Sequence, residues 1–230
     1  MEAPGVDGLD VAAAFRPAGD GREAGGDFYD VFPVAEHEWV VVVGDVSGKG
    51  AAAAAVTEFV RRSVRDLAPR LRDPAELLYA LNRAVLDHDT DRFCTVVVVR
   101  LVDAGGHWSL TGSVGGHPLP VLRRPDGSVD EIGAHGSLVG VIAAPLFTTF
   151  EHPLNDDLLL IYTDGVTEAR HAGELFGLEG LLPLVAGCEH EPAALTAKVL
   201  GAVLDFQDGD PRDDIALLAL TRAGDPEEPG

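Results

Sequence analysis

The chain has 230 residues, 46% of them apolar, and carries a formal charge of -21. The length suits one domain with a sizeable core, and the excess of carboxylates excludes nucleic acid and anionic membrane surfaces as electrostatic partners. The two cysteines, Cys94 and Cys188, have neither disulfide-framework nor metal-ligand spacing, which predicts a reducing, cytoplasmic location. No apolar run reaches the roughly 20 residues of a membrane-spanning helix and no secretory leader is recognisable, so a soluble protein is expected.

The first part of the chain predicts three strands followed by two helices. Apolar and aromatic runs place the strands at residues 11–15, 28–32 and 38–43, the last of them fully buried. A helix is predicted over residues 50–67, because apolar residues recur there at helical spacing and Pro69 follows the pattern. Asp73 as the cap and Pro74 in the first turn predict a second helix, to about Leu86.

The remainder of the chain is richer in strands. Residues 94–102, 108–111, 120–123 and 128–132 are predicted as strands joined by short turns, which indicates an antiparallel meander. Strands at residues 147–152 and 157–163, helices at 178–185 and 192–205, and a last strand at 214–221 follow. This order favours an α+β sandwich of two antiparallel sheets with helices outside. We expect one domain over residues 11–222, with a disordered lead at 1–10 and a disordered tail at 223–230.

Four aspartates stand where predicted strands begin or end. They are Asp27, Asp45, Asp164 and Asp213. If these strands are neighbours in two facing sheets, their ends converge at one edge, and the glycines at residues 25–26 would let the backbone approach another group closely. Carboxylates packed together without counter-ions repel one another, and two divalent cations would reverse that repulsion. Taken singly, each aspartate is equally explained as a turn or helix cap.

A nucleotide-binding loop is the main alternative for the stretch VVVVGDVSGKG at residues 40–50. A P-loop requires G-x-x-x-x-G-K-[ST], but the interval from Gly44 to Gly48 is one residue too short and Gly50 follows Lys49 where a hydroxyl is needed. Asp45 would also face the phosphates without a cation between them. The spacing therefore excludes a nucleotide switch and favours a carboxylate metal ligand.

Five motifs in fixed order carry a resemblance to a known family. They are GGDFYD (residues 25–30), VGDVSGKG (43–50), GGHP (115–118), YTDGVTEA (162–169) and DDIAL (213–217). Together they resemble the metal-dependent protein phosphatases (PPM), and most closely the bacterial SpoIIE-like serine/threonine phosphatases of sigma-factor regulation. The resemblance covers residues 11–221 and implies an αββα sandwich.

The resemblance also implies a set of metal ligands. Asp45 would bridge two Mn²⁺ or Mg²⁺ ions, Asp164 and Asp213 would complete one site, and Asp27 with the backbone carbonyl of Val46 would form the other. Such a pair of ions activates a water for attack on phosphoserine or phosphothreonine without a covalent phosphoenzyme. The implied substrate is a phosphorylated STAS-type anti-anti-sigma factor, and sensor domains are expected upstream in the full-length protein.

Other residues of these motifs leave alternatives open. Asp30 and Asp214 are candidates for metal contact or for solvation and capping, and His117 for proton donation or a supporting turn. Lys49 could pair with a phosphate or simply begin a helix. Local backbone contacts are expected of Ser47 and Thr167, and Glu168 and Arg170 are weak candidates for substrate contact.

Two positions depart from the family pattern. Eukaryotic relatives follow the bridging aspartate with Gly-His, where this chain has Val46 and Ser47, so protonation of the leaving group falls to water. Ala216 replaces a threonine that is frequent after the last acidic pair. An alternative function is a non-catalytic docking or regulatory module of the same fold, which the intact set of four carboxylates argues against.

Overall fold

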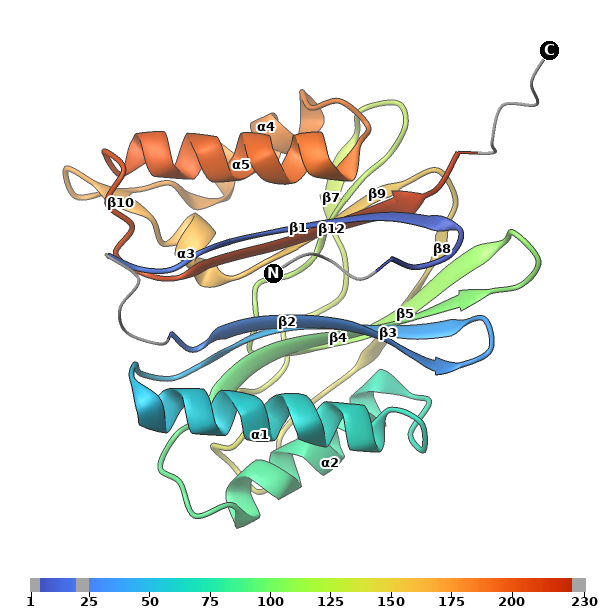
Figure 1. Ribbon diagram of the computed structural model, residues 1–230, viewed down its shortest axis with the longest axis vertical. Coiled ribbons are helices and arrows are strands. Elements are labelled where there is room, and N and C mark those ends of the chain that lie inside the picture. The colour runs from blue at the N-terminus through green and yellow to red at the C-terminus, as the bar shows by residue number, and fades with distance from the viewer. Residues whose placement is uncertain (1–4, 20–24, 225–230) are drawn as a thin grey trace.

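The computed structural model describes residues 5–19 and 25–224 (Figure 1). Two antiparallel sheets lie face to face, and a pair of helices covers the outer face of each sheet. The strand orders are β2-β3-β4-β5-β8 and β1-β12-β9-β6-β7. The expected αββα sandwich is therefore confirmed.

The first sheet contains the longest apolar strands. It consists of β2 (Asp27–Ala35), β3 (Glu38–Val46), β4 (Cys94–Asp103), β5 (Trp108–Gly115) and β8 (Thr149–Leu154). In β3, Val41 and Val43 belong to the core between the sheets, whereas Val40 and Val42 pack toward the helices. This is the alternation of a strand that is buried on both faces.

The second sheet places both ends of the described chain side by side. It consists of β1 (Leu9–Arg16), β12 (Ile215–Arg222), β9 (Leu158–Tyr162), β6 (Val121–Arg123) and β7 (Val129–Glu131). β12 lies between β1 and β9 and is antiparallel to both. Its side chains are buried on both faces, which explains the continuous apolar run in this last strand.

The helix pairs form the two outer layers. α1 (Ala51–Leu67) and α2 (Pro74–Asp87) cover the first sheet, and α4 (Gly177–Ala186) and α5 (Pro192–Phe206) cover the second. Asp73 caps α2 as predicted, because its side chain accepts a hydrogen bond of 2.8 Å from the backbone N–H of Ala75. Apolar layers thus lie between the sheets and under each helix pair.

Two features of the observed topology differ from the expectation. The predicted meander is wrong, because β4 and β5 pair in the first sheet while β6 and β7 belong to the second. The chain crosses between the sheets after Gly115, and β8 returns to pair with β5. The short elements α3 (Asp164–Thr167), β10 (Arg170–His171) and β11 (Glu174–Leu175) were not predicted, because each is too short for a periodic pattern.

The start of the domain lies inside the expected lead. β1 begins at Leu9, and Val6 is buried in the core between the sheets. The backbone N–H of Ala223 donates to the carbonyl of Gly8, which ties the end of the last strand to the start of the first. The parts of the expected lead and tail at residues 1–4 and 225–230 lie outside the described residues.

Both cysteines are free thiols and both are buried. Within residues 5–19 and 25–224, no helix is long and apolar enough to cross a membrane.

Candidate functional site

Strand ends from both sheets meet at one edge of the molecule, on the left in Figure 1. In the first sheet, Asp27 opens β2 and lies directly opposite Asp45 near the end of β3. In the second sheet, Asp164 follows β9 as the first residue of α3, and Asp213 lies two residues before the start of β12. The convergence expected from the sequence is therefore present.

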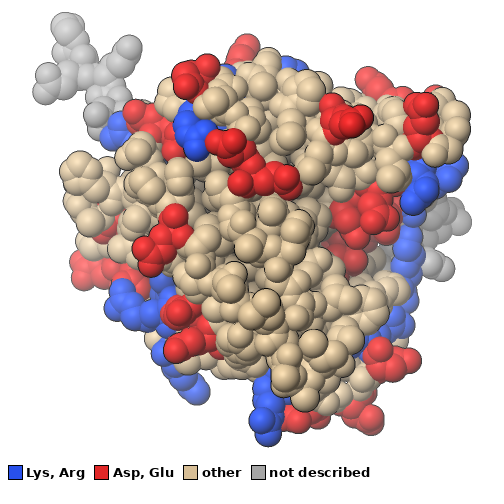
Figure 2. Space-filling view, turned by 180° about the vertical axis from the view of Figure 1, so that it is seen from behind, with Lys and Arg blue, Asp and Glu red and all other residues tan. Residues whose placement is uncertain are grey.

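Electrostatic coupling shows that these carboxylates share one environment. Asp45 interacts repulsively with Asp164, Asp213 and Asp214, and Asp27 interacts repulsively with Asp45 and Asp164. We call Asp27, Asp45, Asp164, Asp213 and Asp214 the aspartate cluster. Asp27 and Asp45 lie in strands of the first sheet, and the other three members lie next to the ends of β9 and β12 in the second. Figure 2 shows many further acidic side chains on one face of the molecule, so the cluster lies in an already negative protein.

Burial and mutual repulsion raise the pKa of three members of the cluster, Asp27, Asp45 and Asp164. Burial, followed by repulsion from other members, raises the pKa of Asp45 to about 7. The pKa of Asp27 is raised well above its ordinary value, chiefly by burial, although a hydrogen bond from Thr163 opposes the change. Burial and then Asp213 raise the pKa of Asp164. All three directions indicate negative charge that the surrounding protein does not balance.

Thr163 links the two sheets at the cluster. Its buried hydroxyl donates to Oδ2 of Asp27 at 2.6 Å and accepts from the backbone N–H of Ala216 at 2.9 Å. Asp27 belongs to the first sheet, whereas Ala216 lies in β12 of the second sheet and Thr163 directly follows β9 of that sheet. This role of Thr163 was not predicted from the sequence, in which its position beside Asp164 is the signal that points to it.

Glycines allow the backbone to close around the cluster. A Cβ added to Gly26 would lie 2.0 Å from the carbonyl oxygen of Val46 and 2.3 Å from Oδ1 of Asp45. A Cβ on Gly25 would lie 1.3 Å from Oδ2 of Asp214. Real atoms cannot approach so closely, which confirms that these glycines permit a close backbone approach. The carbonyl of Val46 thus lies beside the Asp45 carboxylate.

The two aspartates before β12 point in different directions. Asp214 is 4% exposed, and its Oδ1 accepts a 2.8 Å hydrogen bond from the backbone N–H of Ala18. The side chain of Asp213 is 62% exposed and its Oδ1 lies 3.5 Å from Nζ of Lys49. The structure therefore brings Asp214 into the cluster, where the sequence left its place open.

The donor set fits hard divalent cations. Carboxylate oxygens converge from four separate segments and a backbone carbonyl lies beside them. The raised pKa values of Asp27, Asp45 and Asp164, caused first by burial and then by neighbouring carboxylates, show that the folded protein disfavours negative charge on these three side chains. Among the described residues, no three His, Cys, Asp or Glu side chains already stand close enough to share one ion. The outward position of Asp213 beside Lys49 is in keeping with this.

Asp30 and His117 do not join the cluster. Asp30 faces α1 and accepts hydrogen bonds of 2.6 and 2.7 Å from the Arg65 guanidinium. His117 is buried, with its Nδ1 2.9 Å from the hydroxyl of Thr95. Burial lowers the pKa of His117 to about 3, although the neighbouring backbone of Tyr162 opposes the change, so its imidazole is neutral at neutral pH.

A cavity of about 350 Å³ borders the cluster at Asp164. Its lining includes His117, Thr167 and Glu168, and Glu168 adds to the repulsion that raises the pKa of Asp164. Arg170 lies farther along, exposed in the β10–β11 hairpin. Three of the weaker candidates therefore line one cavity beside the cluster.

Comparison with known proteins identifies the family. A family model described as stage II sporulation protein E (SpoIIE) matches residues 35–223. The chain belongs to this family. As a SpoIIE-family protein it is 25% identical over 225 residues to phosphoserine phosphatase RsbU of Bacillus subtilis (strain 168), an alignment that covers 95% of the chain and 65% of RsbU.

Solved structures of related proteins share the fold. The crystal structure of the RsbU and RsbW domains of a Mycobacterium tuberculosis protein matches this SpoIIE-family chain with a TM-score of 0.79 and 28% identity, over 98% of the chain and 65% of the other. The PP2C phosphatase domain of SpoIIE from Bacillus subtilis, with a fragment of its regulatory domain, matches with a TM-score of 0.78 and 18% identity, over 94% and 64%. The expected PPM (PP2C-type) fold is thus confirmed.

Proposed function

We propose that the chain is a metal-dependent protein serine/threonine phosphatase that hydrolyses phosphoserine or phosphothreonine in the cytoplasm. The observation that carries the proposal is the convergence of Asp27, Asp45, Asp164 and Asp213 from both sheets at one edge. The similarity to RsbU, a phosphoserine phosphatase, supports the same reaction. The alignment covers 65% of the length of RsbU. We also propose that sensor domains lie upstream of this chain in a longer protein.

Four members of the cluster have a proposed role in metal binding. Asp45 would bridge two cations, Mn²⁺ or Mg²⁺, with Asp164 and Asp213 on one and Asp27 and the Val46 carbonyl on the other. When bound, such a pair lowers the pKa of a water and stabilises charge on phosphoryl oxygens. The hydroxyl of Thr163 fixes the carboxylate of Asp27, because it donates to Oδ2 from the opposite sheet.

The residues of the chain leave protonation of the departing alkoxide to water. Ser47, at the position of the histidine in eukaryotic relatives, is committed to the backbone of Phe93: its Oγ accepts from that N–H at 3.1 Å, and its own N–H donates to that carbonyl at 2.9 Å. His117 is neutral and buried. Neither Ser47 nor His117 is therefore suited to donate a proton to the leaving group at neutral pH.

The proposed substrate is a phosphorylated STAS-type anti-anti-sigma factor. The similarity to RsbU, and to a protein whose crystal structure contains RsbU and RsbW domains, supports a place in sigma-factor regulation. Within this proposal the chain removes the phosphate from a serine or threonine of that partner. A panel of phosphorylated STAS proteins, compared at equal concentration, would test the assignment.

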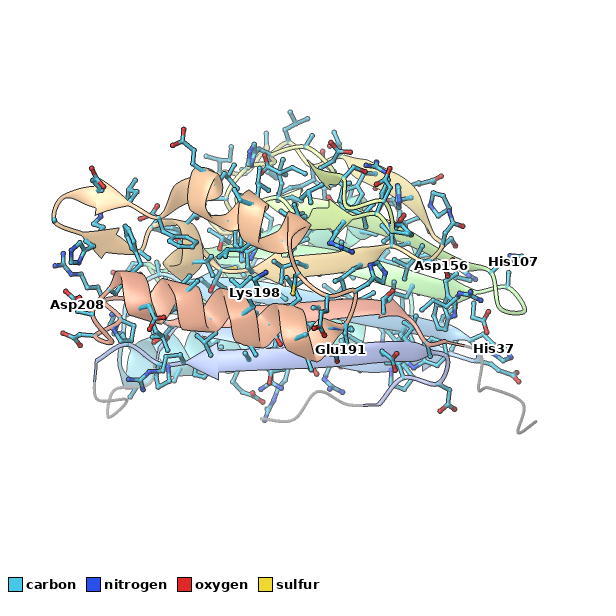
Figure 3. All side chains as sticks on the ribbon, turned by 90° about the horizontal axis from the view of Figure 1, so that it is seen from above. His37, His107, Asp156, Glu191, Lys198 and Asp208 are labelled. Atoms are coloured by element: carbon cyan, nitrogen blue, oxygen red, sulfur yellow. The ribbon has the colours of Figure 1, made fainter. Side chains whose placement is uncertain are left out.

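Hydrolysis by the purified chain tests the proposed reaction. We expect release of phosphate from a phosphoserine protein and from an aryl phosphate in Mn²⁺, none after chelation, and loss of both activities in Asp45→Asn with an unchanged circular dichroism spectrum. Asp156→Asn is the matched control, because Asp156 is an exposed residue that pairs with Arg222. Figure 3 labels it near a loop end. Equal turnover by Asp45→Asn would refute the mechanism, and metal-dependent partner binding without hydrolysis would indicate a docking module.

A further inference from the structure

A second cavity, of about 390 Å³, borders the aspartate cluster on the side of Asp214. Two basic side chains line it, Lys49 from the segment before α1 and Arg212 from the segment before β12. The other charged residues in its lining are Asp210 and Asp214, and Asp214 is held by the N–H of Ala18. The cavity thus borders the cluster and has two basic side chains in its lining.

Lys49 is held only weakly in its present position. Its Nζ lies 3.5 Å from Oδ1 of Asp213 and donates to the carbonyl of Arg212 at 3.2 Å, and its side chain is 44% exposed. An ion pair exposed to this degree contributes about 0–1 kcal/mol, so little opposes a change of partner. A cation held by Asp213 would also offset the carboxylate charge that Lys49 now faces.

The Arg212 guanidinium is free to bind an anion for a different reason. Within residues 5–19 and 25–224 its guanidinium has no hydrogen-bond or ion-pair partner, and the residue is exposed. It borders both this cavity and a smaller one of about 150 Å³ that Asp213 and Glu168 also line. A planar guanidinium presents several donors to phosphate oxygens, whereas an ammonium acts as a point charge.

The charge of the site shows why additional positively charged side chains would help substrate binding. The cluster has five carboxylates, two divalent cations supply four positive charges, and a phosphoserine brings about two negative charges at neutral pH. The sum remains negative, in a protein whose formal charge is -21. Lys49 and Arg212 are positioned to reduce this excess where a phosphoryl group would enter.

We propose that Lys49 and Arg212 form an anion-binding subsite that holds the phosphoryl group of the substrate at the edge of the aspartate cluster. The inference rests on the proposed function and adds the residues that bind the phosphate. Lys49 is the nearer of the two basic groups to a cluster carboxylate, so it contacts the phosphoryl oxygens. Arg212 supports binding from the outer side of the cavity. The binding of every phosphate monoester, and of inorganic phosphate itself, should then depend on Lys49.

Steady-state kinetics at saturating Mn²⁺ test this subsite. The variants are Lys49→Met, Lys49→Arg and Arg212→Met, with Lys198→Met as a control for the same loss of charge. Lys198 lies on α5 over the second sheet, labelled in Figure 3, whereas Lys49 precedes α1 on the first. The readouts are KM and kcat for a phosphoserine peptide, and the inhibition constant of inorganic phosphate.

We expect Lys49→Met to raise KM and the inhibition constant of inorganic phosphate about tenfold, the effect of losing one charge-assisted hydrogen bond. Lys49→Arg should restore most of the affinity, Arg212→Met should give a smaller increase, and Lys198→Met should give none. The salt dependence of KM should also weaken in Lys49→Met, because a screened charge has been removed.

The failures of the two proposals are distinguishable. If the wild-type chain hydrolyses the peptide but Lys49→Met leaves both constants unchanged, the subsite is refuted and the phosphatase function stands. If only the peptide constant changes, Lys49 contacts an acidic residue of the substrate, which also refutes the phosphoryl assignment. If the wild type is inactive, the phosphatase function fails. Calorimetric binding of inorganic phosphate to the Mn²⁺-loaded wild type and Lys49→Met then decides the subsite alone.

Discussion

Replacing Asp45 by asparagine removes one negative charge from the aspartate cluster while nearly preserving the size of the side chain. The pKa of Asp45 is raised from 3.8 to about 7, with burial as the largest cause and Asp164 and Asp213 as the next. The folded protein therefore binds this proton more tightly than the unfolded chain does. For the metal-free protein, stability is lost as the pH rises from about 4 to about 7, and the loss is complete above that range.

The magnitude follows from the interval between the two values. Each pH unit corresponds to about 1.36 kcal/mol, so the raised pKa of Asp45 lowers the free energy of unfolding by about 4 kcal/mol at pH 8, where Asp45 is ionised, and by roughly 1 to 2 kcal/mol at pH 5, where it is protonated in the folded state. A buried asparagine amide with incomplete hydrogen bonding costs about 2 kcal/mol. Asp45→Asn should therefore stabilise the metal-free protein by about 2 kcal/mol at pH 8 and be close to neutral at pH 5.

Urea unfolding in the presence of a chelator, at pH 8 and at pH 5, measures both quantities. Asp156→Asn serves as the control, since this exposed carboxylate forms only a surface pair with Arg222. Addition of Mn²⁺ should raise the free energy of unfolding of the wild type more than that of Asp45→Asn. Binding to the folded state adds stability, and the variant lacks a carboxylate that is proposed to hold the metal. Destabilisation by Asp45→Asn at pH 8, or the same change at both pH values, would contradict the electrostatic reasoning.

Four other substitutions separate the site from the scaffold. Gly26→Ala should abolish activity and lower stability, because its Cβ would lie 2.0 Å from the carbonyl oxygen of Val46. In the control variant Gly201→Ala, in α5, the added Cβ meets nothing within 4 Å, so the free energy of unfolding should rise by about 0.5–1 kcal/mol. Thermal melts compare the two variants. Thr163→Val should cost about 1–3 kcal/mol in urea unfolding and weaken Mn²⁺ binding in calorimetry, because it leaves Asp27 without its donor. Arg100→Met should lower the free energy of unfolding by about 3–5 kcal/mol, because the buried guanidinium of Arg100 pairs with Glu38 at 3.0 Å. Its Mn²⁺ affinity should be unchanged, because this pair lies far from the cluster. A loss of Mn²⁺ affinity equal to that of Thr163→Val would disprove this separation of site from scaffold.

Apolar runs and turn residues predicted nearly all strands and helices, but not how the strands divide between sheets. The turn signals between β4 and β5 and between β6 and β7 correctly indicated local hairpins. Nothing in the sequence marks the crossing after Gly115, because either sheet offers the same kind of apolar partner to a short strand. That choice depends on contacts between residues far apart in sequence, such as the pairing of β6 with β9.

Alternation along a strand explains which acidic residues reach the cluster. Asp27 and Asp30 are three positions apart in β2, so their side chains point to opposite faces of the sheet. Asp27 accordingly meets Thr163 between the sheets, while Asp30 meets Arg65 on α1. Period-two alternation alone could have separated these two. The contact of Thr163 with Asp27 spans 136 residues and could not be predicted from either local motif.

The division of the cluster between the sheets makes the site a product of their packing. Neither sheet holds more than three of the five carboxylates, and Asp27 and Asp45 reach the others only because the core between the sheets closes. That apolar core supplies the free energy that keeps the repelling carboxylates together, at about 25 cal/mol for each Å² of apolar surface buried. Any cation that relieves the repulsion stabilises the same contact, since it binds only the packed arrangement. Metal affinity and the stability of the sheet packing should therefore change together in variants of the core between the sheets, even where no ligand is touched.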